Sequence, residues 1–390
     1  MAQQTVDARM QAVLTRPGIH ADKGNPSGND VRGLYLKLFS GEMFRGFQRN
    51  AIARDLVTRR TLTSGKSLQF IYTGRTTAEY HTPGKSIMGN DDNAPPVAEK
   101  IVTVDDLLIS SAFLYNLDEV LAHYDMRAEI SRKIGYALAQ KYDRLIFRAI
   151  TRGARAEHPI KQTGFVEPGG TQVRVGTTGS GADAFDADSL VKAFYDAAAA
   201  LDEKGVSEDG RVAVLNPRQY YQLIQGAKGG SGLINRDETG SALQSGQGII
   251  EIAGIKVYKS MNIPFFQRYG TAYSTGGAAA GKTGVATPGN VGDFTSEAIE
   301  AGAKDTTKGI HNEYGVASEF ANSCGLIFQR EAAACVEAIA PQVQVTSGDI
   351  STIYQGDVIL GRLAMGADYL NPAACVELFA GTGSKPNQFA

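Results

Sequence analysis

The sequence predicts an α+β fold, because one long amphipathic helix occurs among several separate strand-like runs. Over residues 125–150, apolar side chains recur every three or four positions and charged ones take the other side, the pattern of a helix with one buried face. Runs rich in branched and aromatic residues lie before and after it and predict strands. Glycine supplies 45 of the 390 residues, which indicates many tight turns. The length predicts two domains, or one domain with large excursions.

The composition is that of a globular protein, with 43% hydrophobic and 21% charged residues. A net charge of −2 argues against a dedicated nucleic-acid-binding surface, although the chain could lie beside DNA without gripping it. Cys324, Cys335 and Cys375 have no paired spacing, so we expect reduced and buried thiols. No signal peptide or membrane-spanning run is recognisable, which predicts a soluble protein that assembles inside a cell.

The first 34 residues are polar and predict a flexible arm. Residues 35–60 are compatible with a short amphipathic helix. Five arginines in this stretch form a candidate basic face: Arg45, Arg49, Arg54, Arg59 and Arg60. Two interpretations stand side by side, a solvated surface and an inner face near nucleic acid.

Two strand-like runs, 67–72 and 99–109, predict the legs of a β-hairpin. The segment between them is polar and rich in glycine and proline, which makes it a poor contributor to a core. Loops of this length inside a compact domain are uncommon and usually contact something else. We therefore expect the tip of the hairpin to grip a partner.

The helix over 125–150 would be about 39 Å long, since each residue rises about 1.5 Å, and could act as a rigid beam. After a linker at 169–181, a second helix is predicted to begin at a cap, Asp188 or Ser189, and to end at Gly205.

The second half of the chain predicts a buried strand at 211–215 and then a helix with Asn216 as its N-cap and Pro217 in its first turn. Further strands are predicted at 249–258, 325–329, 343–346 and 374–379.

The stretch 276–283 matches the spacing of a phosphate-binding loop, with Gly276, Gly281, Lys282 and Thr283 at the defining positions. A working loop needs a buried strand before it and a helix after it. Proline and glycine interrupt the chain on both sides, so neither element is predicted. These residues are interpreted as a surface loop, and nucleotide binding is the weaker alternative.

Other chemistry leaves no recognisable pattern. The five histidines are scattered, and no metal-ligand spacing, nucleophile elbow or dinucleotide fingerprint is present. We therefore predict no catalytic residue, no metal and no cofactor. The balance favours a structural or assembly protein over an enzyme.

A set of short motifs resembles the major capsid proteins of the T7-like short-tailed bacteriophages (podoviruses), with a cyanophage among the possible sources. The motifs that carry the resemblance are SGE at 40–42, SGKSLQF at 64–70, GRT at 74–76, AEY at 78–80, PGK at 83–85, EKIVTVDDLL at 99–108 and HYDMRAE at 123–129. The run 325–379 is similar more loosely, whereas 152–185 and 265–320 depart from the family.

The resemblance implies the capsid fold named for phage HK97, which belongs to the α+β class. Five parts are expected in chain order: an N-terminal arm and short helix (1–60), an extended E-loop hairpin (61–112), a spine helix in a peripheral domain (113–185), an axial domain (186–330) and returning C-terminal strands (331–390). Expected subunit-contact residues are His81, Pro83, Gly84, Lys85, Asp91, Asp92, Arg127, Arg132 and Arg144.

The implied function is a major capsid protein that self-assembles, as hexamers and pentamers, into an icosahedral T=7 shell around double-stranded DNA. The implied partners are a scaffolding protein during assembly and a portal protein, and no membrane is involved. The chain would be assembled in the host cytoplasm and end in the virion. No motif for a covalent cross-link between subunits is present, so non-covalent contacts are expected. An encapsulin-type compartment shell and, more remotely, a P-loop NTPase are the alternatives.

Overall fold

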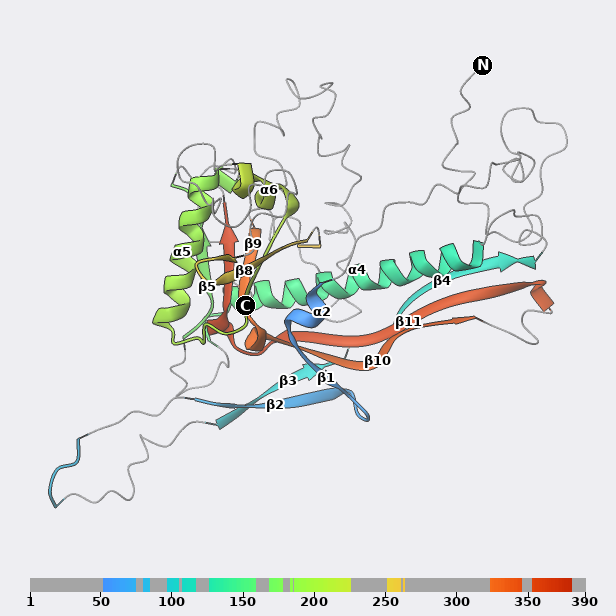
Figure 1. Cartoon of the computed structure of the whole chain (residues 1–390). Coiled ribbons are helices and arrows are strands. Elements are labelled where there is room, and N and C mark those ends of the chain that lie inside the picture. Colours follow the sequence, from blue (N-terminus) through green and yellow to red (C-terminus); the bar gives the residue numbers. More distant parts are fainter. Residues whose placement is uncertain are drawn as a thin grey trace. The chain divides into compact units, whose positions relative to one another are not determined.

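The computed structural model describes residues 52–74, 80–84, 97–104, 107–116, 126–158, 168–177, 183–184, 186–225, 251–260, 262–263, 323–345 and 353–380 (Figure 1). The described residues belong to two compact units. Unit 1 takes them from 107–141 and 339–364, and unit 2 takes them from 51–106, 142–338 and 365–390. Helix α4 (Met126–Arg155) and strands β10 (Ala333–Val345) and β11 (Gly356–Tyr369) each contribute to both units.

Unit 1 is built on an antiparallel pair of strands. Strand β4 (Leu108–Tyr115) pairs with the first half of β11, in a register that runs from Gly356 opposite Tyr115 to Leu363 opposite Leu108. The first part of α4 lies against one face of this pair. A side chain at Gly361 would overlap Ile134 and Leu138 of the helix, so only glycine permits this close approach.

Unit 2 contains a six-stranded mixed sheet with the order β5-β12-β9-β6-β8-β7. Its strands are β5 (Thr171–Arg174), β12 (Cys375–Phe379), β9 (Ser323–Gln329), β6 (Arg211–Leu215), β8 (Ile255–Lys259) and β7 (Glu251–Ile252). All five residues of β6 are buried. The apolar run 212–215 predicts this burial for four of them, and the fifth, Arg211, pairs with Asp202 at 2.6 Å. Helices α5 (Ala187–Glu203) and α6 (Pro217–Gln225) contribute Leu190, Phe194 and Leu223 to the core of this sheet.

The remaining elements of unit 2 are short. Helix α2 (Ala53–Leu56) leads into β1 (Thr58–Thr61), which runs parallel to the start of β10. Strands β2 (Ser67–Thr73) and β3 (Val97–Thr103) form a separate antiparallel hairpin. Two 3₁₀ turns, η6 (Arg330–Ala332) and η7 (Pro372–Ala374), precede β10 and β12.

Most predicted elements are confirmed. The long helix, the hairpin legs, the strand at 211–215, the helix after Asn216 and the strand pair near 255 are all present. Gly205 ends α5 at a φ of +71°, a conformation that suits glycine. The three cysteines are buried and unpaired.

Four details of the prediction are wrong. The cap of α5 is Asp186, whose carboxylate accepts a hydrogen bond from the Ser189 backbone at 3.0 Å, rather than Asp188 or Ser189. The run 99–109 is two strands, because β3 ends at Thr103 and β4 begins at Leu108. The linker at 169–181 contains β5, which is stabilised by parallel pairing with β12. The predicted strand at 343–346 is the end of the much longer β10.

Candidate subunit-contact sites

The β2–β3 hairpin leaves one face almost entirely in solvent. Directly opposed residues share a face, and one such face carries Gln69 with Ile101, Ile71 with Glu99 and Thr73 with Val97. On this face Ile71 is 79% exposed, Val97 61% and Ile101 44%. An isolated two-stranded hairpin is only marginally stable in water, so an apolar exposed face of this kind points to a partner surface.

The base of the hairpin is fixed to the body of unit 2. The Lys100 ammonium lies 3.2 Å from a carboxylate oxygen of Asp368 and 3.8 Å from the centre of the Tyr369 ring. Arg152 of α4 approaches the other oxygen of Asp368 at 3.9 Å. A Cβ atom at Gly366 would overlap the carbonyl oxygen of Thr103, so the backbones of β11 and β3 touch here. These contacts position the projecting part of the hairpin.

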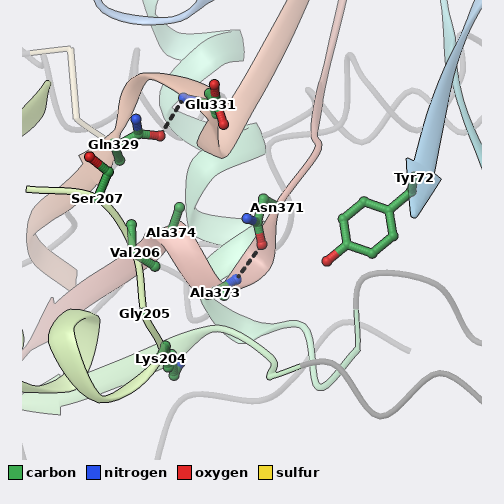
Figure 2. A pocket seen from close by; sticks show the side chains of 10 residues that line it. All are labelled: Tyr72, Lys204, Gly205, Val206, Ser207, Gln329, Glu331, Asn371, Ala373 and Ala374. Carbon is green, nitrogen blue, oxygen red and sulfur yellow. Dashed lines mark hydrogen bonds between the residues drawn. The ribbon is translucent and has the colours of Figure 1, made fainter. Parts of the chain in front are cut away.

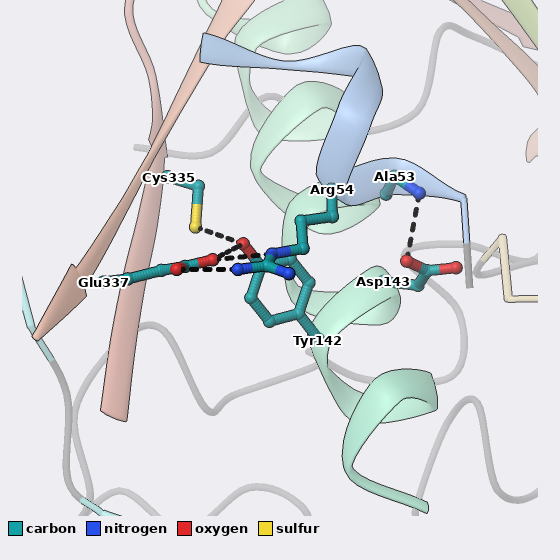
Figure 3. Close-up of polar contacts among 6 residues, drawn as sticks. All are labelled: Ala53, Arg54, Tyr142, Asp143, Cys335 and Glu337. Carbon is teal, nitrogen blue, oxygen red and sulfur yellow. Dashed lines mark hydrogen bonds and ion pairs between the residues drawn. The ribbon is translucent and has the colours of Figure 1, made fainter. Parts of the chain in front are cut away.

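The segment that follows the N-terminal region is held by Asp143 of α4 (Figure 3). Its carboxylate accepts hydrogen bonds from the backbone N–H groups of Ile52 and Ala53, each at 3.0 Å. A third donor, the side-chain amide of Asn262, also lies at 3.0 Å. Burial raises the pKa of Asp143, and the three hydrogen bonds oppose that rise because they favour the ionised form.

A second set of polar contacts lies beside the first, around Glu337 of β10, as Figure 3 shows. Arg54 donates two hydrogen bonds to the Glu337 carboxylate, at 3.0 and 3.1 Å, and the Tyr142 hydroxyl donates a third at 2.7 Å. Burial by itself would raise the pKa of Glu337, but the hydrogen bonds from Arg54 and Tyr142 outweigh it and the pKa is lowered. Burial raises the pKa of Tyr142 and brings the pKa of Cys335 to about 12.

A buried ion pair joins the end of α4 to β12. Arg155 donates two hydrogen bonds of 2.7 Å to the carboxylate of Glu377, and both side chains are fully buried. The Gln172 amide donates a further bond to Glu377 at 2.9 Å. The geometry is that of a structural ion pair, since the charges are desolvated and mutually satisfied.

A polar pocket lies between the hairpin, the turn after α5 and the two 3₁₀ turns (Figure 2). Ten residues line it: Tyr72, Lys204, Gly205, Val206, Ser207, Gln329, Glu331, Asn371, Ala373 and Ala374. Lys204 donates to the backbone oxygen of Gly169 at 2.5 Å and to the Thr171 hydroxyl. The side-chain amide oxygens of Gln329 and Asn371 accept hydrogen bonds from the backbone N–H groups of Glu331 and Ala373. The lysine and the two amide side chains are thus engaged in local structural contacts.

The predicted contact residues fall into three groups. His81, Pro83 and Gly84 are exposed, as is Arg132 on α4. Arg127 forms an ion pair of 2.8 Å with Asp357 inside unit 1, and Arg144 is buried within its own chain at 3% exposure. Lys85, Asp91 and Asp92 lie outside the described residues.

The predicted basic face is divided in the same way. Arg59 and Arg60 are exposed on β1, whereas Arg54 is paired with Glu337. Arg45 and Arg49 lie outside the described residues. So do Gly276, Gly281, Lys282 and Thr283 of the phosphate-loop pattern.

The described part of the chain lacks two features. No group of three or more potential metal-ligating side chains was found there. No helix within the described ranges has both the length and the apolar character needed to cross a membrane.

The anchoring residues Asp143, Glu337 and Asp368 were missed by sequence reasoning. The partners Asp143 and Ala53 are 90 residues apart, and Arg54 and Glu337 are 283 apart. Nothing in the local pattern marks them, because an acidic residue in a helix or strand is ordinarily a solvated surface residue.

Comparison with protein families matches residues 69–379 to the model of the Gp10A-like family, described as "Major capsid protein". The chain belongs to the Gp10A-like family of major capsid proteins. The match includes most of β2, all of α4 and every other described strand except β1. The resemblance to capsid proteins of T7-like podoviruses is thereby confirmed, and the comparisons do not favour an encapsulin or an NTPase.

Individual relatives of the chain are also major capsid proteins. The chain is 30% identical over 213 residues to the major capsid protein of Escherichia phage T7, which covers 53% of this chain and 60% of that protein. It is 35% identical over 128 residues to the major capsid protein of Enterobacteria phage T3, covering 32% and 36% respectively. The matched part thus spans less than two thirds of the length of each of these relatives.

Solved structures extend the comparison to nearly the whole chain. The capsid structure of cyanophage P-SCSP1u is 28% identical, with a TM-score of 0.65 over 93% of this chain and 100% of that one. The mature capsid of bacteriophage PhiM1, at 16% identity and a TM-score of 0.57 over 91% and 94%, shares the fold. The predicted HK97-type capsid fold of the α+β class is confirmed.

Proposed function

We propose that many copies of this chain assemble, as hexamers and pentamers, into an icosahedral shell with T=7 geometry. A scaffolding protein would take part in assembly, a portal protein would occupy one vertex, and the mature shell would enclose double-stranded DNA. Assembly would occur in the host cytoplasm, and the product would be the capsid of the virion. Membership of a major capsid protein family and likeness to a cyanophage capsid support this proposal.

The observation that carries the proposal is the exposed apolar face of the hairpin. Ile71, Val97 and Ile101 are between 44% and 79% exposed in the single chain, although each fully buried side chain of this kind contributes about 1.5–3 kcal/mol. No described part of this chain buries that face, so we assign the stabilisation to contact with another molecule. In a protein built to self-assemble, the other molecule is a second subunit.

We assign the parts of the chain accordingly. Residues 1–60 would form the arm, 61–112 the E-loop region, 113–185 the spine, 186–330 the axial part and 331–390 the returning strands. The exposed residues His81, Pro83, Gly84 and Arg132 would contribute to contacts between subunits. Arg59 and Arg60, exposed on β1, would face the packaged DNA, and the near-neutral net charge would keep that DNA mobile.

The test is to co-express the chain with its scaffold and to count closed particles by electron microscopy. The double substitution Ile71→Ser with Ile101→Ser removes apolar surface that is already exposed, so circular dichroism and the melting temperature of the subunit should not change. Particle yield should fall at least about tenfold, because the lost burial exceeds about 1.4 kcal/mol.

Gln69→Ser is the matched control, since it changes the same face without removing apolar surface. It should assemble like the unmodified chain. Closed particles at full yield from the double variant would show that this face is not a subunit contact.

A further inference from the structure

Strand β4 of unit 1 has an edge without a partner among the described strands. Its only neighbour there is β11, and its eight residues, LISSAFLY, contain neither a charged residue nor a proline. Ile109 is 52% exposed, and Ser111 is exposed beside it. An edge of this length and composition is a template for another strand, and proteins that do not use such edges usually protect them.

The other outer strands are mostly protected. Strand β1 carries Arg59 and Arg60, β5 has four residues and ends in Arg174, and β7 has only two residues. Strand β3 carries Glu99 and Lys100. Strand β2 is also uncharged, but it belongs to the hairpin whose exposed face is already assigned to a subunit contact.

The side chains of β4 are arranged symmetrically about Ser111. Leucine, isoleucine and serine precede it at 108–110, and alanine, phenylalanine and leucine follow it at 112–114. Reading outward from Ser111 in either direction therefore gives a small residue, then a large apolar one, then leucine.

We propose that β4 pairs antiparallel with β4 of a second copy, about a two-fold axis that passes through Ser111. The inference rests on the proposed function, since it names one of the contacts by which subunits join. The sheet that contains β4 in one copy and the same sheet in the second copy would then form one continuous sheet across the axis. This is strand addition in which both partners are the same strand.

The register of β4 on β11 determines which side chains would meet. Ile359, Leu114 and Gly361 lie on the face that α4 covers, so Ile109, Ser111 and Phe113 lie on the opposite, open face. A two-fold axis perpendicular to the sheet places the open faces of the two copies on one side and their covered faces on the other. On the open face, Ile109 would lie opposite Phe113 of the second copy on both sides of the axis.

On the covered face, Leu108 would lie opposite Leu114 of the second copy, and Ser110 opposite Ala112. Large apolar residues thus meet large apolar residues, and small ones meet small ones. Aliphatic–aromatic pairs of this kind stabilise neighbouring strands in addition to the backbone hydrogen bonds. The absence of charge on β4 agrees with this pairing. A charged residue near the axis would lie close to the same charge of the second copy and repel it.

A cysteine at the axis tests this arrangement, because only there does a residue face itself. Ser111→Cys should give disulfide-linked dimers when particles assembled with scaffold are oxidised and then run on a non-reducing gel. The native cysteines are buried and should not react. Ser110→Cys is the control, since diagonal neighbours lie about 7–8 Å apart, beyond disulfide reach. Predominantly dimeric Ser111→Cys with monomeric Ser110→Cys is the expected result.

Charge substitutions give a second test that does not depend on disulfide geometry. Ser111→Lys and Ser111→Glu should each lower particle yield, because like charges would meet at the axis. Co-expression of the two variants should restore much of the yield, because lysine would then meet glutamate.

The outcomes separate the inference from the proposed function. The β4 pairing would be overturned if closed particles of Ser111→Cys gave no disulfide-linked dimers. It would also be overturned if co-expressed Ser111→Lys and Ser111→Glu gave as few particles as each variant alone. Neither result would contradict shell assembly. Dimers between Ser111→Cys and a cysteine placed at Ser67 would instead assign the edge to β2 of a neighbour. If no particles form, shell assembly fails, and dimers of the unassembled chain still decide the pairing.

Discussion

The carboxylate of Asp143, on α4, accepts a hydrogen bond of 3.0 Å from the backbone N–H of Ala53, 90 residues earlier in the chain. The same carboxylate accepts hydrogen bonds from the backbone N–H of Ile52 and from the side-chain amide of Asn262, so three donors converge on one buried acid. Backbone donors at the start of a short helix are otherwise unsatisfied, and here α4 provides the acceptor. The start of α2 is thus fixed to α4 by one side chain.

Replacement of this acid should loosen the N-terminal attachment. Asp143→Asn would place an amide N–H₂ group against one donor if it replaces Oδ1, or against two if it replaces Oδ2. An unsatisfied buried donor costs about 1–3 kcal/mol. We expect the free energy of unfolding of the unassembled chain to fall by that amount in denaturant titrations. Asp55→Asn is the control, because Asp55 is exposed on α2 and should change stability little. Equal effects of the two substitutions would contradict the anchoring role.

Glu337 should make stability depend on pH. Its pKa is lowered in the folded chain, so its contribution is fully present above the ordinary glutamate pKa of about 4.3 and is lost as the pH falls through the lowered value. The unfolding free energy of the unmodified chain should exceed that of Glu337→Gln by about 1–3 kcal/mol near neutral pH. This difference in unfolding free energy between the two proteins should decrease at acidic pH. A difference that stays constant down to about pH 3 would argue against an ionised Glu337 in the folded state.

The pair of Lys100 and Asp368 should control how firmly the hairpin is held. Lys100→Met keeps most of the aliphatic stem but removes the charge that faces Asp368 and the Tyr369 ring. Backbone amides of β2 and β3 should then exchange with deuterium several-fold faster, while amides of β6 and β9 keep their rates. Glu99→Gln, on the exposed face of the same strand, should leave the hairpin rates unchanged. Uniform acceleration over the whole chain would indicate general destabilisation instead.

Two glycines provide a sharper contrast. Gly366→Ala would force a methyl group into the carbonyl oxygen of Thr103, so β11 and β3 must separate and the melting temperature should fall. Gly135→Ala, in α4, meets no atom within 4 Å and replaces a poor helix former with the best one. It should raise stability by about 0.5–1 kcal/mol. A tolerated Gly366→Ala would mean that the strands are not in contact at this point.

The amino-acid sequence alone was sufficient to predict the class, the long helix, the hairpin legs and the family. Each of these depends on a local signal: the period of 3.6 over α4, the alternation in β2, the Asn-Pro start of α6, and short motifs in fixed order. Such signals survive without tertiary contacts because neighbouring residues along the chain are sufficient to produce them.

Which polar residues hold the architecture together depends on contacts between distant parts of the chain. Arg54 was predicted on a basic face and is paired with Glu337, and Arg144 was predicted at a contact and is buried. The linker before α5 became β5 because β12, some 200 residues later, offers a parallel edge. The physical reason is the same throughout: the free energy of a charged or strand-forming residue depends on which partner removes it from water, and that partner lies far away in sequence.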